Sequence, residues 1–232
     1  MRAGDAIEYH GGLAREWEAK YAERRSFRAR HQRLGALLAE AVRSGASWLD
    51  AGCGTGHFSR EIARLGARVT GVDGAASMIE AARAYDASVA SDIAYRVTGD
   101  LARLQEPDGA FDGILCSSVL EYLAEPGAAL AEFRRVTRPG GALVVTLPNA
   151  RALIRAAHSV QFAITRATQS KPTPEYLAHV KHMWSPRAAG ELVAAAGYVV
   201  QSLRPGGLGL GPAWLDRQPL WGPLLFVTAR RA

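Results

Sequence analysis

A glycine-rich segment of the chain has the residue types and spacing of a small-molecule binding loop. Residues 50–56 read DAGCGTG, so three glycines alternate with other residues directly after an acidic one. Glycines at a turn let the backbone bend sharply and let a ligand approach it closely. A dinucleotide fingerprint would need a third glycine at position 57, where this chain has His57. The segment therefore indicates a ligand that has no pyrophosphate at this turn.

Two further carboxylates follow later strand-like runs. Asp73 lies 21 residues after Gly52, where a carboxylate can accept hydrogen bonds from both hydroxyls of a ribose. Asp100 comes directly after Gly99, where it can accept a hydrogen bond from an adenine amino group. In an open α/β sheet such groups meet beyond the carboxyl ends of the strands. Together with the glycine loop they predict an adenosine site.

Strand and helix patterns alternate along most of the chain and must position these residues. Short apolar runs predict seven strands, over 48–50, 67–72, 93–98, 111–116, 142–147, 198–203 and 224–229. Helical periodicity predicts one or two helices over 11–43 and further helices over 57–65, 77–85, 118–123, 126–136 and 186–196. Such alternation is typical of a parallel sheet of right-handed βαβ units. We therefore expect an α/β protein with a Rossmann-like, doubly wound sheet of seven strands.

The chain length and composition indicate one domain with a large core. The 232 residues are 48% hydrophobic, and we treat 1–232 as a single domain. Within it we expect a helical lid over 1–45 and a ligand-binding core over 46–148. Residues 149–185 have no strand signal and predict a helical insert before the last βαβ step. Residues 186–232 then supply the C-terminal strands.

The order of the motifs resembles a known family. The segments concerned are 50–56 (DAGCGTG), 71–73 (GVD), 99–100 (GD) and 138–141 (RPGG). Across about residues 30–147 they resemble the class I S-adenosylmethionine-dependent methyltransferases. Residues 111–122 (FDGILCSSVLEY) are most similar to the ubiquinone-biosynthesis O-methyltransferase type. The resemblance implies S-adenosyl-L-methionine as cofactor and S-adenosyl-L-homocysteine as product.

The same resemblance implies which residues bind the cofactor. Arg33 corresponds to an arginine that holds the methionine carboxylate, with Arg30 as the alternative. The other implied positions are Asp50, Gly52, Cys53, Gly54, Gly56, Asp73, Gly74, Asp100, Leu101 and Ser117. The family usually has Glu-His where this chain has Glu121-Tyr122, and that histidine is associated with metal or substrate in some members. We therefore expect no metal site.

Two histidines of the insert are candidate catalytic residues. Methyl transfer from a sulfonium is an in-line displacement, so the protein mainly positions the reactants. A phenolic acceptor also benefits from a general base. His179 and His182 are three residues apart and share a face if their segment is helical, although a surface position is an equal alternative. From the lid, Tyr9 and His10 are expected to close over the cofactor.

The remaining histidines and the cysteines have less reactive expected roles. His57 should form a local hydrogen bond, and His31 and His158 should lie on the surface. Cys53 and Cys116 should be small packed residues, since no neighbour in sequence lowers a thiol pKa. Two cysteines cannot form a disulfide framework, so a reducing cytoplasm is the expected location.

Basic charge leaves several partners to consider. The formal net charge is +6, and residues 151–187 contain six Arg or Lys but one Glu. Residues 150–169 combine these cations with an apolar stripe, formed by Leu153, Ala157, Val160 and Ile164. Such a helix can contact an anionic membrane peripherally or pack over a substrate pocket. An amino-directed nucleic-acid methylase would have an Asn/Asp-Pro-Pro-aromatic motif, but residues 116–119 read CSSV, so nucleic acid is not the expected partner.

The sequence as a whole predicts methyl transfer to a small-molecule acceptor. O-methylation of a phenol, hydroxyl or carboxylate is the leading expectation. N- or C-methylation of a metabolite, RNA methylation and non-catalytic cofactor binding are the alternatives. No apolar run approaches the ~18 residues of a membrane span, and the first residues have no apolar leader region. The oligomeric state is left open.

Overall fold

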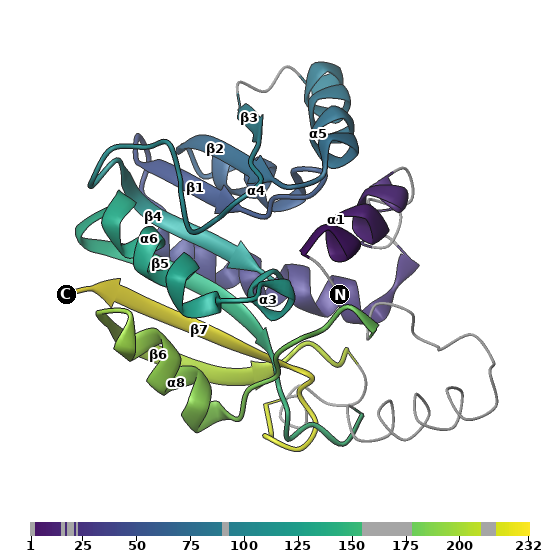
Figure 1. The fold of residues 1–232 in the computed structure, drawn as a ribbon, viewed down its shortest axis with the longest axis vertical. Helices are drawn as coiled ribbons and strands as arrows, with labels where there is room; N and C mark the ends of the chain where they lie inside the picture. The colour runs from purple at the N-terminus through teal and green to yellow at the C-terminus, as the bar shows by residue number, and fades with distance from the viewer. Residues whose placement is uncertain are drawn as a thin grey trace.

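The computed structural model describes residues 3–14, 17, 21, 23–89, 93–154, 178–209 and 217–232. In it the expected seven-stranded sheet is confirmed (Figure 1). The strands are β1 Ser47–Ala51, β2 Arg68–Asp73, β3 Ala94–Val97, β4 Phe111–Ser117, β5 Thr137–Pro148, β6 Tyr198–Gly206 and β7 Leu224–Arg231. They lie in the order β3-β2-β1-β4-β5-β7-β6. Chain order reverses between β1 and β4, which makes the sheet doubly wound.

One strand runs against the others. The pairs from β3 through β5 are parallel, whereas β7 is antiparallel to both β5 and β6. Consequently β6 is parallel to β5, and the chain between them forms the last βαβ step. The strand β7 then fills the gap left between β5 and β6.

Helices cover both faces of the sheet (Figure 1). They are α1 Ala3–Gly12, α3 Arg25–Ala41, α4 His57–Arg64, α5 Ala76–Val89, α6 Pro126–Val136 and α8 Pro186–Ala195, with a 3-10 turn η1 Leu120–Tyr122. Leu34 of α3 and Ile62 of α4 pack with Trp48 of β1. Phe133 of α6 packs with Leu49, the next residue along β1. Because neighbouring strand residues point to opposite faces, α3 and α4 cover one face and α6 covers the other.

The N-terminal helix α1 is anchored on α5. The Ser77 hydroxyl donates to the carbonyl of Gly11 at 3.0 Å. Gly74 leaves room for Ile7, because a Cβ at Gly74 would lie 2.8 Å from the Ile7 Cδ1 atom. The helix is thus fixed beside the end of β2, which is the place expected of a lid.

Several element boundaries differ from the sequence predictions. The first helix starts at Ala3 rather than near residue 11, and it is stabilised by its packing on α5. The helix expected over 118–123 is the single turn η1. Residues 138–141 belong to β5, because Thr137 pairs with Phe111 as soon as α6 ends. The predicted insert is described at 149–154 and 178–185, and its central part, including His158, lies outside the described residues.

The segments flanking that central part are held by a buried amide. The Asn149 side chain donates to the carbonyls of Pro219 and Gly222 at 2.7 and 2.8 Å and accepts from the Arg151 backbone at 3.0 Å. Pro148 accepts a hydrogen bond from the Trp184 backbone at 3.0 Å. These bonds bring the end of β5, the segment before α8 and the segment before β7 together. No described helix is long and apolar enough to cross a membrane.

Candidate cofactor and acceptor site

A large cavity opens at the carboxyl ends of β1, β2 and β4. Its volume is about 1670 Å³, and its lining includes the glycine loop, the ends of these strands and helix α1. Ligand pockets for one small molecule usually measure about 300–1,000 Å³. The position at the point where strand order reverses is where open α/β sheets bind ligands. The cavity therefore has room for an adenosine-containing ligand and a second molecule.

The three glycines of the loop are required by its shape. Gly52, Gly54 and Gly56 have φ values of +77°, +54° and +78°, in the left-handed region that favours glycine. A Cβ at Gly52 would overlap Val119, and one at Gly56 would overlap the Tyr95 ring. Gly52 and Gly54 line the cavity, whereas Gly56 does not and instead packs against Tyr95.

Asp73 connects the end of β2 to the glycine loop. Its carboxylate accepts hydrogen bonds from the backbone N–H of Gly54 and of Ala75, each at 2.9 Å. Burial raises the pKa of Asp73, and these backbone bonds oppose the rise. A carboxylate has about four acceptor positions, so Asp73 retains the capacity to bind ribose hydroxyls. Gly74, the next residue, also lines the cavity.

Asp50 and Cys53 line the cavity but are largely occupied by the protein. The Ser59 hydroxyl donates to the Asp50 carboxylate at 2.7 Å, which fixes the start of the loop to α4. Burial raises the pKa of Asp50 to about 7. Burial also raises the pKa of the Cys53 thiol well above its usual value, so that thiol is not an activated nucleophile.

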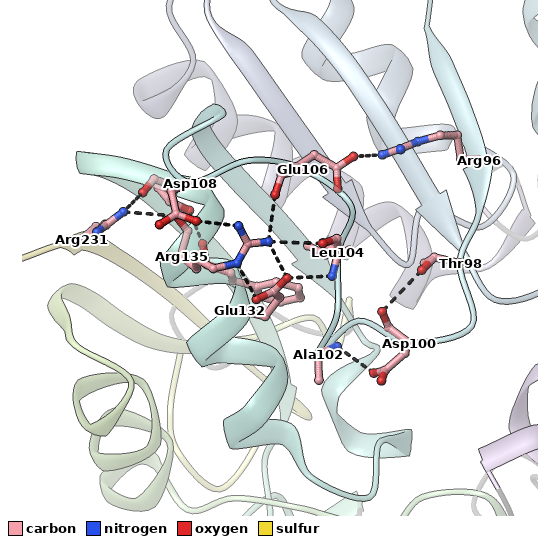
Figure 2. A network of polar contacts seen from close by, with 12 residues as sticks. Arg96, Thr98, Asp100, Ala102, Leu104, Glu106, Asp108, Glu132, Arg135 and Arg231 are labelled. Carbon is pink, nitrogen blue, oxygen red and sulfur yellow. Dashed lines mark hydrogen bonds and ion pairs between the residues drawn. The ribbon is translucent and has the colours of Figure 1, made fainter.

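The loop after β3 forms another wall. Asp100 and Leu101 line the cavity, and the Asp100 carboxylate accepts from the Ala102 backbone at 2.8 Å. The continuation of this loop is held by the Arg135 guanidinium, as Figure 2 shows. Arg135 donates to the carbonyls of Leu104 and Glu106 at 3.2 and 2.8 Å and binds both carboxylate oxygens of Glu132.

The residues bound by Arg135 also contact one another and the loop. Glu132 accepts from the Leu104 backbone at 2.7 Å, and Asp108 accepts from Arg135 at 2.7 Å. The carbonyl of Arg135 in turn accepts from the backbone of Gly109 at 2.9 Å. Helix α6 therefore fixes the shape of the loop that leads from Asp100 to β4.

A strained residue lies where β4 enters the cavity. Ser118 has φ +57°, and among the described residues it alone combines a side chain with a positive φ. Its backbone N–H donates to the Thr146 hydroxyl at 2.9 Å, and Ser117 lies 3.2 Å from the same hydroxyl. Ser117 was expected from the sequence, whereas Ser118 was not. Backbone strain of this kind concentrates at functional sites.

Of the two arginines considered for a carboxylate contact, the alternative is the one at the cavity. Arg30 lines the cavity and Arg33 does not. Helix α3 begins at Arg25 and points its first turns toward the cavity, which leaves Arg33 too far along the helix. The Arg30 guanidinium lies over the Phe27 ring at 4.8 Å, and its buried Nε has no hydrogen-bond partner among the described residues. Arg24 and Arg25 also line this end of the cavity.

The two candidate catalytic histidines do not line the cavity. The His182 Nε2 atom lies 3.1 Å from the carbonyl of Leu123, and its ring stacks on Trp184. The His179 ring stacks on Tyr9, with 4.7 Å between centroids. Their segment is extended after a single turn rather than helical, so the expected shared face does not form.

Two other histidines, His10 and His57, line the cavity. His10 and Tyr9 line the cavity, where the lid was expected to close. The His57 Nε2 atom lies 2.8 Å from the His31 Nδ1 atom, and the His57 ring stacks on Tyr21, in agreement with a local hydrogen-bonding role. His31 is half-buried by this contact instead of lying free on the surface. No cluster of metal-ligating side chains occurs in the part of the chain that the structure describes.

Known proteins share this core. Residues 49–145 match a protein-family model described as a methyltransferase domain. The ubiquinone biosynthesis O-methyltransferase of Xanthomonas oryzae pv. oryzae is 33% identical over 135 residues, which are 58% of this chain and 56% of that protein. The malonyl-[acyl-carrier protein] O-methyltransferase of Yersinia pestis is 44% identical over 96 residues, 41% of this chain and 34% of that protein. The matched residues therefore span 34% to 56% of the length of these curated relatives.

Solved structures share the whole fold. A putative methyltransferase of Haloferax volcanii, in complex with the Trm112 methyltransferase activator, has a TM-score of 0.70 at 20% identity, covering 99% of this chain and 97% of that one. A possible histamine N-methyltransferase of Thermotoga maritima has a TM-score of 0.69 at 16% identity, covering 98% and 100%. The family match shows that residues 49–145 form a methyltransferase domain. The solved structures show that the chain shares their fold.

Proposed function

We propose that this protein transfers the methyl group of S-adenosylmethionine to an oxygen atom of a small organic acceptor. The observation that carries the proposal is one cavity that joins the glycine loop and Asp73 to a space lined by Tyr9, Trp17 and Tyr122. The adenosine-type wall and the ring-lined wall suit two different molecules. The curated relatives named above are O-methyltransferases, which favours oxygen over nitrogen or carbon.

The residues present fit this cofactor. Asp73 would hold the ribose hydroxyls, and Asp100 and Leu101 would border the adenine, since all three line the cavity. The Arg30 guanidinium, with its unpaired buried Nε, is suited to the methionine carboxylate. Ser117 completes the wall at β4. When bound, the cofactor supplies an electrophilic methyl group on a sulfonium.

The remaining work of the protein is positioning and exclusion of water. Buried apolar side chains such as Met78 and Leu101 line the cavity and reduce its solvent content. Helix α1 forms part of the cavity wall and is anchored on α5 through Gly11. An acceptor held there would meet the methyl group with little freedom to rotate, which is how enzymes of this kind lower the barrier.

Calorimetry and a turnover panel test the proposal. The protein is titrated with S-adenosylmethionine and S-adenosylhomocysteine, and then incubated with phenols, aliphatic alcohols, carboxylic acids and amines while S-adenosylhomocysteine is measured. Micromolar binding with turnover of an oxygen acceptor supports the proposal. Turnover of amines alone moves the activity to nitrogen, and binding without any turnover indicates a non-catalytic protein. Salt-dependent RNA binding with RNA methylation would replace the small acceptor by nucleic acid.

We also propose peripheral contact with an anionic membrane beside the cavity. Leu153, Leu220 and Trp221 are 48%, 51% and 42% exposed, and the Leu153 backbone donates to the carbonyl of Leu220 at 2.8 Å. Arg151 and Arg217 are exposed on the same two segments. An apolar patch with neighbouring cations is the composition that binds an anionic lipid surface.

Vesicle sedimentation tests the membrane contact. Vesicles of phosphatidylcholine with phosphatidylglycerol should sediment the protein, and vesicles of phosphatidylcholine alone should sediment much less of it. Full burial of one large apolar side chain contributes roughly 1.5–3 kcal/mol, and Leu153 and Trp221 are each about half exposed. Replacing both by Ser should therefore lower the binding constant for the vesicles by about tenfold or more. A wild-type protein that stays in solution with both vesicles contradicts the contact.

A further inference from the structure

The end of the cavity at the start of α3 is lined by arginines. Arg24 directly precedes this helix, Arg25 is its first residue and Arg30 lies in its second turn. All three line the cavity, where Arg24 and Arg25 are exposed and Arg30 is half-buried. A guanidinium group keeps its proton at any pH near neutrality, so this wall carries a fixed positive charge.

These cations have no acidic partner in the described part of the chain. None of the three forms an ion pair there. The segment 207–209 packs against the start of α3, since a Cβ at Gly209 would lie 2.6 Å from the Arg25 carbonyl oxygen, and this segment contains no acid. The carboxylates that do line the cavity come from other elements and belong to Asp50, Asp73, Asp100, Glu121 and Glu125. A cavity wall with charges of one sign attracts counter-ions, so this end favours an anion.

The cofactor accounts for one of these arginines. In the proposed function Arg30 holds the methionine carboxylate, and its guanidinium lies over the Phe27 ring at 4.8 Å. S-adenosylmethionine has one carboxylate, and the ammonium group of the same amino acid partly offsets its charge. Arg24 and Arg25 therefore line the cavity with neither a described carboxylate nor a cofactor anion to bind.

The arginines adjoin the space assigned to the acceptor. Trp17, one of the rings that line this space, lies edge-on to His10 and to Phe27, with centroids 5.5 and 6.0 Å away. Phe27 is the third residue of α3 and follows Arg25 by two positions. A row of rings thus leads from the acceptor wall to the start of α3. An acceptor that lies along this row presents its far end to Arg24 and Arg25.

We propose that Arg24 and Arg25 bind an anionic group of the acceptor, a carboxylate or a phosphate, apart from the oxygen that receives the methyl group. This inference rests on the proposed O-methylation. A guanidinium presents its N–H donors in a planar fork that matches the paired oxygens of either anion. The anion fixes one end of the acceptor, so its reacting oxygen approaches the methyl group in one orientation.

The first test measures anion preference in the protein saturated with S-adenosylhomocysteine. Calorimetry compares 4-hydroxybenzoate with its neutral methyl ester, and phenyl phosphate with phenol. At least one anion should bind the wild type about tenfold more tightly than its neutral counterpart, and the pair concerned tells carboxylate from phosphate. Arg24→Gln combined with Arg25→Gln should reduce this preference to less than about threefold. Arg43→Gln combined with Arg204→Gln is the matched control, since both arginines are exposed and lie outside the cavity, and it should keep the wild-type preference.

A second titration separates an acceptor site from a cofactor site. The Arg24→Gln and Arg25→Gln double variant should bind S-adenosylhomocysteine as the wild type does, within about twofold, whereas Arg30→Gln should bind it about tenfold more weakly. A double variant that loses this affinity as Arg30→Gln does assigns the two arginines to the cofactor and overturns the inference.

The remaining outcomes distinguish this inference from the proposed function. Equal affinity of the wild type for both anions and their neutral counterparts overturns the inference, and so does an anion preference that survives in the double variant. Turnover of neutral oxygen acceptors without any anion preference leaves the O-methylation standing and refutes the anion site. If the preference depends on Arg24 and Arg25 but no acceptor is turned over, the proposed function fails while the anion site stands.

Discussion

Removing the guanidinium of Arg135 should loosen the loop that borders the adenine side of the cavity. The side chain is 34% exposed and Glu132 is 12% exposed, so their pair is partly shielded from water. The Asp108 carboxylate is 82% exposed and contributes almost nothing. Two bonds to backbone carbonyls and the Glu132 pair remain. Each of these interactions contributes about 1 kcal/mol, so Arg135→Ala should lower the free energy of unfolding by about 2–3 kcal/mol.

The assay is thermal unfolding combined with calorimetry. For a chain of 232 residues that loss corresponds to a Tm lower by about 5–10 °C. The loop must also be ordered on binding, so the affinity for S-adenosylhomocysteine should fall about 5–10-fold. Arg187→Ala is the matched control, because Arg187 pairs with Glu191 on α8 and is 88% exposed. Its Tm should change by no more than about 2 °C.

The pH dependence gives an independent check on Arg135. Hydrogen bonds from Arg135 lower the pKa of Glu132 below its usual 4.5. A lowered carboxyl pKa means that the pair stabilises the fold fully above about pH 4.5, and that this contribution is lost as pH falls through the lowered pKa. The Tm gap between wild type and Arg135→Ala should therefore narrow below about pH 4. An Arg135→Ala variant that matches Arg187→Ala in Tm refutes the reasoning.

Three further changes have defined outcomes. Asp73→Asn should weaken binding of S-adenosylmethionine by about 1–3 kcal/mol in calorimetry, and unchanged affinity removes Asp73 from the site. Gly52 has φ +77°, so Gly52→Ala should lower the free energy of unfolding in urea by about 1–3 kcal/mol. Gly127 has open space around it, so Gly127→Ala should not destabilise the fold. Equal stabilities of the two variants contradict backbone strain at Gly52. Burial and His57 lower the pKa of His31, so its stabilising contribution is present above about pH 6.5 and lost at lower pH. His31→Gln should flatten the fall in Tm between pH 7 and 5, and an unchanged slope argues against this pair.

Local patterns predicted the sheet and the glycine loop well. Each strand except β7 is flanked by a turn or a helix that has its own sequence signal. The positive φ of a glycine likewise depends on only a few neighbouring residues. The loop 50–56 and Asp73 therefore lie where the sequence put them. The predicted adenosine wall is assembled from such local features.

The acceptor side depended on tertiary packing that the sequence pattern does not contain. Which arginine of α3 lines the cavity depends on where that helix starts, and this start is fixed by contacts with Tyr21 and the sheet. Pairing His179 with His182 needed a helix, and hydrogen bonds from the backbone of 181 and 182 to Glu121 hold that segment extended instead. Nothing in a Ser-Ser pair signals the positive φ of Ser118.

The place of β7 in the sheet constrains the order in which the chain can fold during synthesis. Residues 224–231 emerge from the ribosome after β5 and β6, yet they pair with both along their length. Until then the inner edges of β5 and β6 have unpaired backbone groups and can pair with other chains. Pairings between segments this far apart in sequence also form slowly. A nascent chain that stalls before Leu224 should thus expose two unpaired, aggregation-prone strand edges and depend on a chaperone.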